Sequence, residues 1–397
     1  MKKSKLKVLT IVGTRPEIIR LSATIKLLDK HLNQVLVHTG QNYDYELNEI
    51  FFDDLGLRKP DHFMGIDTSS LGTAVGEIIQ KSEEILLQEK PDALLVLGDT
   101  NSCLSAYMAK RMHIPIFHME AGNRSFDFNV PEEINRRIID HIADFNLVYT
   151  EHARRHLLSE GLPHRRIYLT GSPMREVLNE NMDKINNSKI LETLGLKENE
   201  YFMVSTHREE NVDNPENLKK ILTVLNQLAE EYQVPVIVST HPRTKKKLEE
   251  FNLRSSAKPA SSVFHLNPLI QFLKPFGFND YIHLQQNAKC TLSDSGTISE
   301  ESAMLGFPAI SLRQSMERPE AQDAGTIILT GFEPEIVLSS VRTAIAEHEQ
   351  GTEHRRSVPA DYTITDTSWR VLKLILGNAG LSNKWWGINK PAWRSDL

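Results

Sequence analysis

Short apolar runs recur along the chain, and each ends in a tight cluster of polar and small residues. In the first half they lie near residues 6–12, 34–39, 93–97, 115–119, 145–149 and 166–170. In the second half they lie near residues 201–205, 234–240, 262–266, 288–293, 307–312 and 325–329. Longer stretches with helical spacing separate them, such as residues 16–30, 73–89, 131–143 and 365–377. This alternation predicts parallel strands joined by crossover helices.

The alternation occurs twice, which predicts an α/β protein with two doubly wound domains. A chain of 397 residues also exceeds the usual size of one compact domain. We expect an N-terminal Rossmann-like domain at residues 1–174 and a C-terminal Rossmann-like domain at residues 175–360. Residues 361–397 should form a helix and a Trp-rich tail that pack back on the N-terminal domain. Two such domains facing across a cleft resemble the arrangement called GT-B.

Composition narrows the functional classes. A hydrophobic content of 40% and a charged content of 25% are ordinary for a soluble globular protein. The net charge of -6 gives no general affinity for nucleic acid or for an anionic membrane. Cys103 and Cys290 form no CxxC pattern, which favours a reducing compartment. We therefore expect a cytoplasmic enzyme without a nucleic-acid or membrane partner.

Three acids in the first half are candidates for proton transfer. Asp99 follows the run at 93–97, Glu120 follows the run at 115–119, and Glu132 opens a helical stretch after a proline. In open parallel sheets ligands bind at the carboxyl ends of the strands, and carboxylates gathered in a cleft can transfer protons. Arg136 lies four residues after Glu132 on the same helix face, where an ordinary surface ion pair is the alternative.

Two clusters have the composition of anion sites. Arg15 lies in the strand-to-helix turn Gly13-Thr14-Arg15-Pro16-Glu17, which could bind a phosphate or be an ordinary turn. Ser295, Gly296 and Thr297 open a helix whose first N–H groups suit a diphosphate. A capping box is the alternative there.

Further residues could complete these sites. Glu300 or Glu301, in the first turn of that helix, could bind ribose hydroxyls, as acids do in nucleotide-binding folds. Arg318, after the next strand, offers a second cation for an anion. His207 and His241 follow strands of the second half and should face the three acids.

His152 and His156 are four residues apart, but the charged residues around them indicate a solvated helix face rather than a metal site. No HxH pattern supports a metal, and no GxSxG pattern points to a covalent nucleophile.

Taken in order, these clusters resemble the non-hydrolysing UDP-GlcNAc 2-epimerase family. The resemblance runs from about residue 6 to residue 332 and rests on an ordered set of motifs: Gly13-Thr14-Arg15-Pro16-Glu17, Gly98-Asp99-Thr100, His118-Met119-Glu120-Ala121-Gly122, Pro131-Glu132-Glu133-Ile134-Asn135-Arg136, Thr206-His207-Arg208-Glu209, Asp294-Ser295-Gly296 and Glu317-Arg318-Pro319-Glu320. Longer strings resemble the branch that makes UDP-N-acetyl-L-fucosamine: residues 38–49, 98–103, 171–174 and 293–302. That branch epimerises UDP-2-acetamido-2,6-dideoxy-β-L-talose at C2 for surface polysaccharide synthesis.

The resemblance implies an elimination of UDP and its re-addition, without cofactor or metal, in a homodimer. It implies acid–base or intermediate-stabilising roles for Asp99, Glu120 and Glu132. It places Arg15, Arg136, His207 and Arg318 near the diphosphate and sugar, Ser295 and Gly296 at the diphosphate turn, and Glu301 at the ribose. Gln41 matches a family glutamine, and we include His241 among the substrate contacts.

Two positions depart from the GlcNAc enzymes of the family. They have Lys where Arg20 stands, which keeps the charge, and a second Gly where Thr297 stands, which narrows the turn. The alternatives to the L-talose epimerase are a UDP-GlcNAc 2-epimerase that forms UDP-ManNAc, a hydrolysing epimerase and, from another class, a GT-B glycosyltransferase. The three acids argue against the glycosyltransferase.

Overall fold

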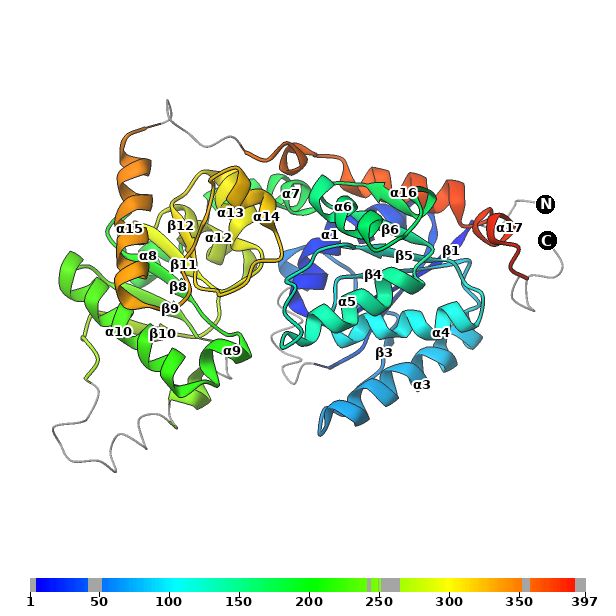
Figure 1. Ribbon diagram of the computed structural model, residues 1–397, viewed down its shortest axis with the longest axis horizontal. Coiled ribbons are helices and arrows are strands. Elements are labelled where there is room, and N and C mark those ends of the chain that lie inside the picture. Colours follow the sequence, from blue (N-terminus) through cyan, green and yellow to red (C-terminus); the bar gives the residue numbers. More distant parts are fainter. Residues whose placement is uncertain are drawn as a thin grey trace. The chain divides into compact units, whose positions relative to one another are not determined.

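The structure, a computed structural model, describes residues 5–41, 52–240, 244–248, 250, 265–351 and 358–389 (Figure 1). By their internal contacts the residues form two compact units. Unit 1 contains Met1–Asn181 and Ala360–Leu397, and unit 2 contains Met182–Pro359. Each unit is built around one parallel sheet.

The sheet of unit 1 has seven strands in the order β3-β2-β1-β4-β5-β6-β7. Their bounds are β1 Lys7–Val12, β2 Asn33–His38, β3 His62–Phe63, β4 Ala93–Leu97, β5 Ile116–Met119, β6 Phe145–Val148 and β7 Ile167–Leu169. The strand β4 is buried at all five positions, as expected where helices cover both faces of a parallel sheet. The direction of winding reverses between β1 and β4, so the carboxyl ends of these two strands flank a natural ligand position.

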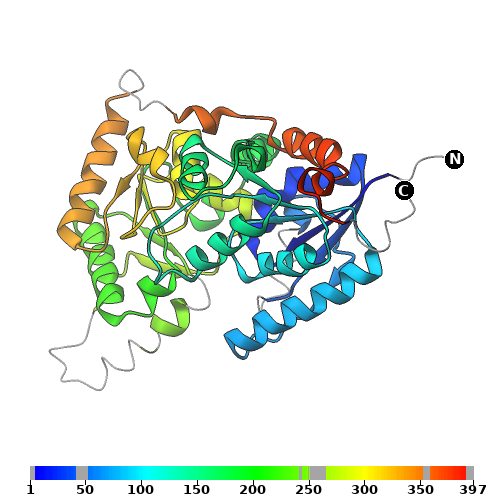
Figure 2. The ribbon, with the colours of Figure 1, turned by 45° about the vertical axis from the view of Figure 1, so that its right-hand side comes forward.

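Helices lie on both faces of this sheet (Figures 1 and 2). They are α1 Arg15–His31, α3 Leu71–Glu89, η1 Asn101–Leu104, α4 Ser105–Arg111, α5 Pro131–Ile142, α6 Glu151–Ser159, η2 His164–Arg166 and α7 Met174–Asn186. One apolar core joins the strands to α3, α4 and α5 through residues such as Ile78, Ala106 and Ile139. Pro16 and Pro131 both lie in the first turn of their helix, where the missing N–H costs no hydrogen bond.

The C-terminal segment belongs to unit 1. It contains η5 Ala360–Thr363, α16 Thr367–Asn378 and α17 Ser382–Trp386. The helix α16 packs beside α1, and the ring of Trp369 lies 5.2 Å from that of His31 (Figure 2). Thr367 donates a hydrogen bond of 3.1 Å to the carbonyl of Thr170. These contacts explain why a segment so late in the sequence belongs to the first unit.

The sheet of unit 2 has six strands in the order β10-β9-β8-β11-β12-β13. Its strands are β8 Phe202–Ser205, β9 Val236–Ser239, β10 Ile270–Leu273, β11 Cys290–Ser293, β12 Ala309–Ser311 and β13 Ile328–Leu329, and its helices are α8 Ile190–Leu194, α9 Glu209–Val212, α10 Pro215–Tyr232, α12 Phe278–Gln286, α13 Ile298–Leu305, α14 Pro319–Asp323 and α15 Pro334–Glu349. Phe202 and Val204 enter one apolar core, whereas Tyr201 and Met203 enter the other. This alternation places a core on each face of the sheet.

One described strand of unit 2 differs from the sequence-based expectation of a strand at 262–266, of which residues 262–264 lie outside the described residues. The apolar run at 262–266 extends into described residues at His265 and Leu266, which are not in a strand. The third strand is instead β10, at the edge of the sheet. Because Gln271 is exposed and the other three residues are only half-buried, β10 lacks the continuous apolar character of an inner strand.

The expected fold class of two doubly wound, Rossmann-like α/β domains is confirmed. In both units the first strand lies at the centre, two strands follow on one side, and the chain then crosses to the other side. The candidate residues after β1 and β4 in unit 1, and after β8 and β11 in unit 2, therefore occupy equivalent positions at the carboxyl edges of their sheets.

Candidate functional site

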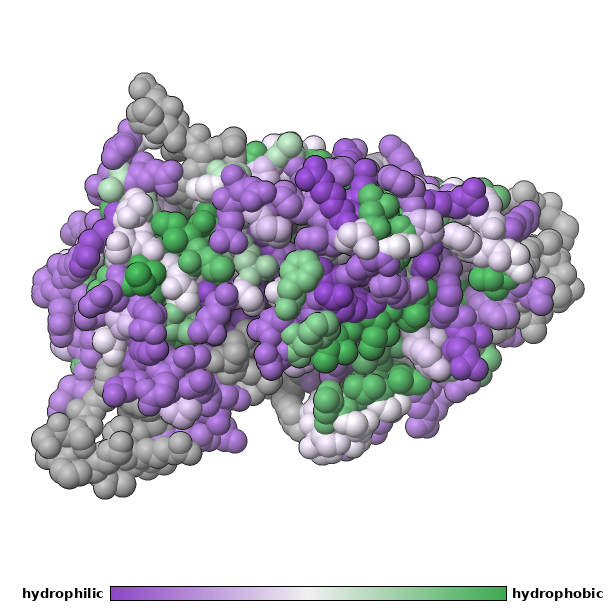
Figure 3. All heavy atoms as spheres, viewed as in Figure 1, coloured by the Kyte–Doolittle hydropathy of each residue, from purple (hydrophilic) through white to green (hydrophobic). Residues whose placement is uncertain are grey.

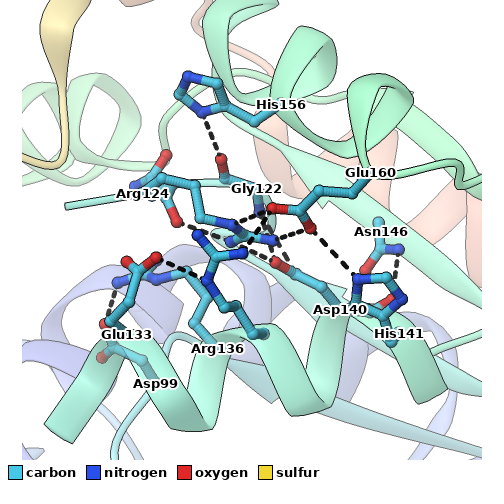
Figure 4. A network of polar contacts seen from close by, with 12 residues as sticks. Asp99, Gly122, Arg124, Glu133, Arg136, Asp140, His141, Asn146, His156 and Glu160 are labelled. Carbon is cyan, nitrogen blue, oxygen red and sulfur yellow. Dashed lines mark hydrogen bonds and ion pairs between the residues drawn. The ribbon is translucent and has the colours of Figure 1, made fainter. Parts of the chain in front are cut away.

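Arg136 brings together two of the three candidate acids in unit 1. Its guanidinium is buried and forms an ion pair with Asp99, which follows β4 (Figure 4). The same guanidinium donates to the main-chain oxygen of Glu120 at 2.8 Å, and its Nη1 lies 3.5 Å from Glu120 Oε1. Arg20 of α1 forms a second ion pair with Glu120. Arg136 is therefore a buried bridge between two carboxylates rather than the partner of a surface pair.

Glu132 has a different environment. It lies on α5 one turn before Arg136 and is half-buried. Within the described part of the chain it forms no ion pair, in contrast to Asp99 and Glu120. The structure thus distinguishes two acids held by arginines from a third that is not.

Glu120 also has an unusual backbone. Its φ is +64°, in the left-handed region that non-glycine residues adopt at a cost of about 1–3 kcal/mol. Gly122 follows with φ +80°, and a Cβ there would lie 2.4 Å from the carbonyl oxygen of Ala153. The turn after β5 is therefore tightly constrained, and such strain is typical of functional sites.

Glu17 is a buried acid that sequence reasoning did not single out. Its Oε2 accepts hydrogen bonds from Gly13 N at 3.0 Å, Thr14 Oγ1 at 2.8 Å and Thr100 Oγ1 at 3.2 Å, and Oε1 accepts one from Ser102. Burial raises the pKa of the Glu17 carboxyl, although these hydrogen bonds act in the opposite direction. Glu17 joins the turn after β1 to the turn after β4. Only its place in the first turn of a helix after Gly-Thr-Arg-Pro could have indicated this.

Two further sequence candidates border these turns. Arg15 is the first residue of α1 and is half-buried. Gln41 donates from Nε2 to Thr100 Oγ1 at 3.3 Å, so it joins the same edge of the sheet.

In unit 2, Asp294 organises the loop that carries His207. Its Oδ2 accepts from the backbone N–H groups of His207 and Arg208 at 2.9 and 3.0 Å and from Asn211 Nδ2 at 2.7 Å. His207 Nδ1 lies 3.1 Å from Asp294 Oδ1, while 44% of the His207 side chain is exposed. Burial by itself would raise the pKa of Asp294, but His207 and the neighbouring N–H groups outweigh it and lower the pKa to about 2. Sequence reasoning quoted Asp294 in a motif but gave it no role.

The turn Ser295–Thr297 precedes α13. Ser295 Oγ accepts from Thr297 N at 3.3 Å, which is a local turn and not the capping box that the sequence left open as the alternative. Arg318 is buried, donates to the carbonyl of Gly296 at 2.7 Å and forms an ion pair with Glu300. A small pocket is lined by residues that include Ser295, Gly296, Arg313 and Arg318. Cations and a helix start border one pocket, as anion binding requires.

Glu300, Glu301 and His241 are the remaining candidates for contacts with the nucleotide. Glu300 forms an ion pair with Arg318. Glu301 is buried and accepts a hydrogen bond of 3.0 Å from Gln285 Nε2. His241 lies outside the described residues.

In the described ranges, no three His, Cys, Asp or Glu side chains are arranged to hold a metal ion. No helix in those ranges is long and apolar enough to cross a membrane.

Comparison with known proteins identifies the class to which this fold and these turns belong. Residues 26–376 match the family described as UDP-N-acetylglucosamine 2-epimerase. The chain is 48% identical to UDP-N-acetylglucosamine 2-epimerase from Rickettsia bellii, whose structure superposes with a TM-score of 0.86 over 96% of this chain and 100% of that one. The Methanocaldococcus jannaschii UDP-GlcNAc 2-epimerase in complex with UDP-GlcNAc and UDP is 34% identical, with a TM-score of 0.85 over 94% of this chain and 100% of that one.

A third relative has another substrate in its name. The UDP-2,3-diacetamido-2,3-dideoxy-D-glucuronate 2-epimerase of Pseudomonas aeruginosa is 33% identical over 348 residues, covering 86% of this chain and 93% of that protein. The chain is thus a UDP-sugar 2-epimerase, a non-hydrolysing isomerase. It belongs to the UDP-N-acetylglucosamine 2-epimerase family.

Proposed function

We propose that the candidate acids of unit 1 carry out epimerisation at C2 by elimination and re-addition. A base takes the C2 proton while the C1–O bond breaks, and UDP leaves with the bonding electrons. The products of this step are a 2-acetamidoglycal and UDP. UDP then adds back at C1, and the proton returns to the other face of C2. The observation that carries the proposal is the Arg136 bridge, which holds the carboxylates of Asp99 and Glu120 at one sheet edge.

In this mechanism unit 2 retains the UDP. The helix start at Ser295–Thr297 and the guanidinium of Arg318 supply N–H groups and positive charge for a diphosphate. His207 lies beside Asp294, the residue before this turn, and its side chain is partly exposed. In this mechanism His207 contacts the substrate. Arg15, Gln41 and Glu301 complete the proposed substrate contacts, together with Arg20, Thr297 and His241.

We propose UDP-2-acetamido-2,6-dideoxy-L-talose as the substrate and UDP-N-acetyl-L-fucosamine as the product, for surface polysaccharide synthesis. The support is the resemblance of the strings at 38–49, 98–103, 171–174 and 293–302. The second candidate is epimerisation of UDP-GlcNAc, and it is favoured by relatives that bear that name or bind that sugar. A pocket that binds the 6-methyl group of the L-talose sugar should accept the 6-hydroxyl of UDP-GlcNAc somewhat less well. We therefore expect a clear but finite preference for the L-talose sugar over UDP-GlcNAc.

A substrate panel in deuterated water tests both parts of the proposal. The purified protein is incubated with UDP-2-acetamido-2,6-dideoxy-L-talose and with UDP-GlcNAc, and products are followed by NMR. Faster turnover of the L-talose sugar, with deuterium at C2 of the epimer, is expected. Faster turnover of UDP-GlcNAc would replace the substrate but keep the mechanism, whereas an epimer without C2 label would refute the proton exchange.

The roles of the three acids are tested by neutral variants of the same shape. Asp99→Asn, Glu120→Gln and Glu132→Gln should each lower kcat by about a hundredfold or more, as loss of an acid–base group does. Melting temperatures show whether the fold is kept. Near-normal turnover in all three would refute the assignment.

We also propose a homodimer, formed through an apolar face of unit 1. Hydrophobic side chains gather over α3, α4 and α5 in Figure 3. Exposed apolar side chains on these helices include Leu87, Tyr107, Ile134 and Ile138. Exposed apolar areas of this kind mark interaction sites. Ile134→Glu should give monomers in sedimentation velocity, while Ile336→Glu, at an equally exposed isoleucine of unit 2, should not. If Ile134→Glu still forms dimers, the interface does not lie on this face of unit 1.

A cytoplasmic location completes the proposal. Its support is that Cys103 and Cys290, the two cysteines of the chain, are both buried and form no disulfide, as is usual in reducing compartments.

A further inference from the structure

Asp140, near the end of α5, has a fully buried carboxyl group (Figure 4). Its two oxygens accept from the backbone N–H of Gly122 at 3.3 and 3.1 Å. Its Oδ2 also pairs with Arg124 Nη1 at 2.7 Å. Both partners belong to the turn that begins at Glu120, so Asp140 fixes that turn at two points.

Asp140 is linked to the other acid-bearing turn through His118. Its Oδ1 lies 3.0 Å from His118 Nδ1, and His118 Nε2 lies 2.7 Å from the carbonyl oxygen of Gly98. A carbonyl only accepts, so Nε2 carries a hydrogen and donates it to Gly98. Gly98 immediately precedes Asp99. One buried carboxylate is therefore connected to the turns of both Asp99 and Glu120.

The charges around Asp140 keep it ionised. Burial would raise its pKa, but the His118 ring and the Arg124 guanidinium beside the carboxyl lower the pKa below its usual value. Arg124 is in turn held by Glu160 of the segment after α6, through contacts of 2.8 Å at Nε and 2.7 Å at Nη2. The network is continuous, and Asp140, His118 and Arg124 at its centre are buried, as a rigid support of a site requires.

The turn at Glu120 needs such support. The left-handed backbone of Glu120, φ +64°, persists only where surrounding contacts enforce it. His156 Nδ1 lies 2.9 Å from the carbonyl oxygen of Gly122 in the same turn (Figure 4). Arg136 donates to the carbonyl oxygen of Glu120, also in this turn. Asp140 adds a second link to the turn at Gly98, through His118, beside the link that Arg136 makes to Asp99.

We propose that Asp140 is a positioning residue for the epimerisation: it holds the turns of Asp99 and Glu120 in their reactive arrangement without touching the substrate. The proposal rests on the roles proposed for those two acids. Because the side chain is fully buried, Asp140 acts only through Gly122, Arg124 and His118.

The test compares two buried aspartates that lie four residues apart. Asp140→Asn keeps the side-chain shape but replaces one acceptor by a donor facing Arg124 or His118. Asp144→Asn is the matched control, because Asp144 is also buried and accepts from Ile116 N at 3.0 Å and Lys110 Nζ at 2.6 Å. It lies at the amino ends of β5 and β6, at the opposite edge of the sheet from the acids.

For each protein, kcat and KM are measured with the UDP-sugar that the wild type turns over fastest, the affinity for UDP by calorimetry and the melting temperature by circular dichroism. Asp140→Asn should lower kcat at least tenfold and leave UDP affinity within twofold, since the diphosphate turn belongs to unit 2. Asp144→Asn should lower the melting temperature without changing kcat. A wild-type kcat in Asp140→Asn, or an equal loss in Asp144→Asn, would overturn the proposal.

If Asp140→Asn does not fold, His118→Asn takes its place. Asparagine can still donate toward Asp140 but cannot reach Gly98, so kcat should fall at least fivefold with UDP affinity kept. An unchanged kcat would equally overturn the proposal. Failure of the proposed function is recognised separately, because the wild type would then epimerise no UDP-sugar, or Asp99→Asn and Glu120→Gln would remain active.

Discussion

The ionisation of Asp294 should stabilise the folded protein by an amount that depends on pH. The pKa of this carboxyl is about 2 in the folded protein, against an ordinary value of 3.8. Since a difference of one pKa unit corresponds to about 1.4 kcal/mol, ionised Asp294 contributes about 2 kcal/mol at neutral pH. The cause is structural: the buried carboxylate accepts two backbone N–H groups and one side-chain amide and lies beside His207.

The sign of the pH dependence follows from the lowered pKa. The stabilisation is complete well above pH 3.8 and is lost as the pH falls through about 2. At pH 3 roughly half of it, about 1 kcal/mol, should remain. Asp294→Asn cannot ionise, so the free-energy difference between wild type and variant isolates this one group from all others that titrate in acid.

Urea unfolding followed by far-ultraviolet circular dichroism, at pH 7 and at pH 3, measures that difference. Wild type should be more stable than Asp294→Asn at pH 7, and the advantage should shrink by about 1 kcal/mol at pH 3. A difference that stays constant between the two pH values would refute the reasoning, because the carboxylate would then not be linked to folding. An advantage that grows in acid would reverse the sign of the pKa shift.

Three further outcomes are expected. Arg318→Ala should weaken UDP binding at least tenfold in calorimetry, and Ser295→Ala should weaken it less, because only the arginine contact is charge-assisted; unchanged affinity in Arg318→Ala would exclude this turn from the diphosphate site. Glu17→Gln should lower both kcat and the melting temperature, since an amide places a donor among four hydrogen-bond donors, with about 1–3 kcal/mol at stake; wild-type values of both would show that the turns hold without it. Gly122→Ala should destabilise the protein by about 2 kcal/mol or more, because its Cβ would lie 2.4 Å from the carbonyl oxygen of Ala153 at a φ of +80°; an unshifted melting temperature would show that the turn can relax.

The fold class and the elements that carry the candidate residues could be predicted from the amino-acid sequence alone. Inner strands of a parallel sheet are buried on both faces, so runs such as Ala93–Leu97 stand out in the sequence. The half-exposed edge strand Ile270–Leu273 does not, and it was misplaced. Strand ends also indicated where Asp99, Glu120 and Ser295 would lie, because ligand sites form at the carboxyl edge.

Which of these residues contact one another, and which other residues hold them in place, depends on contacts between residues that are far apart in the sequence. Arg136 looked like half of a surface pair with Glu132, yet it is buried between Asp99 and Glu120. Glu17, Asp140 and Asp294 had no distinctive pattern of their own, because their importance comes from backbone N–H groups and side chains that are distant in sequence. The periodicity that predicts a helix or strand depends on neighbouring residues and can be recognised in the sequence. The role of a buried carboxylate depends on hydrogen-bond donors that only folding brings close to it.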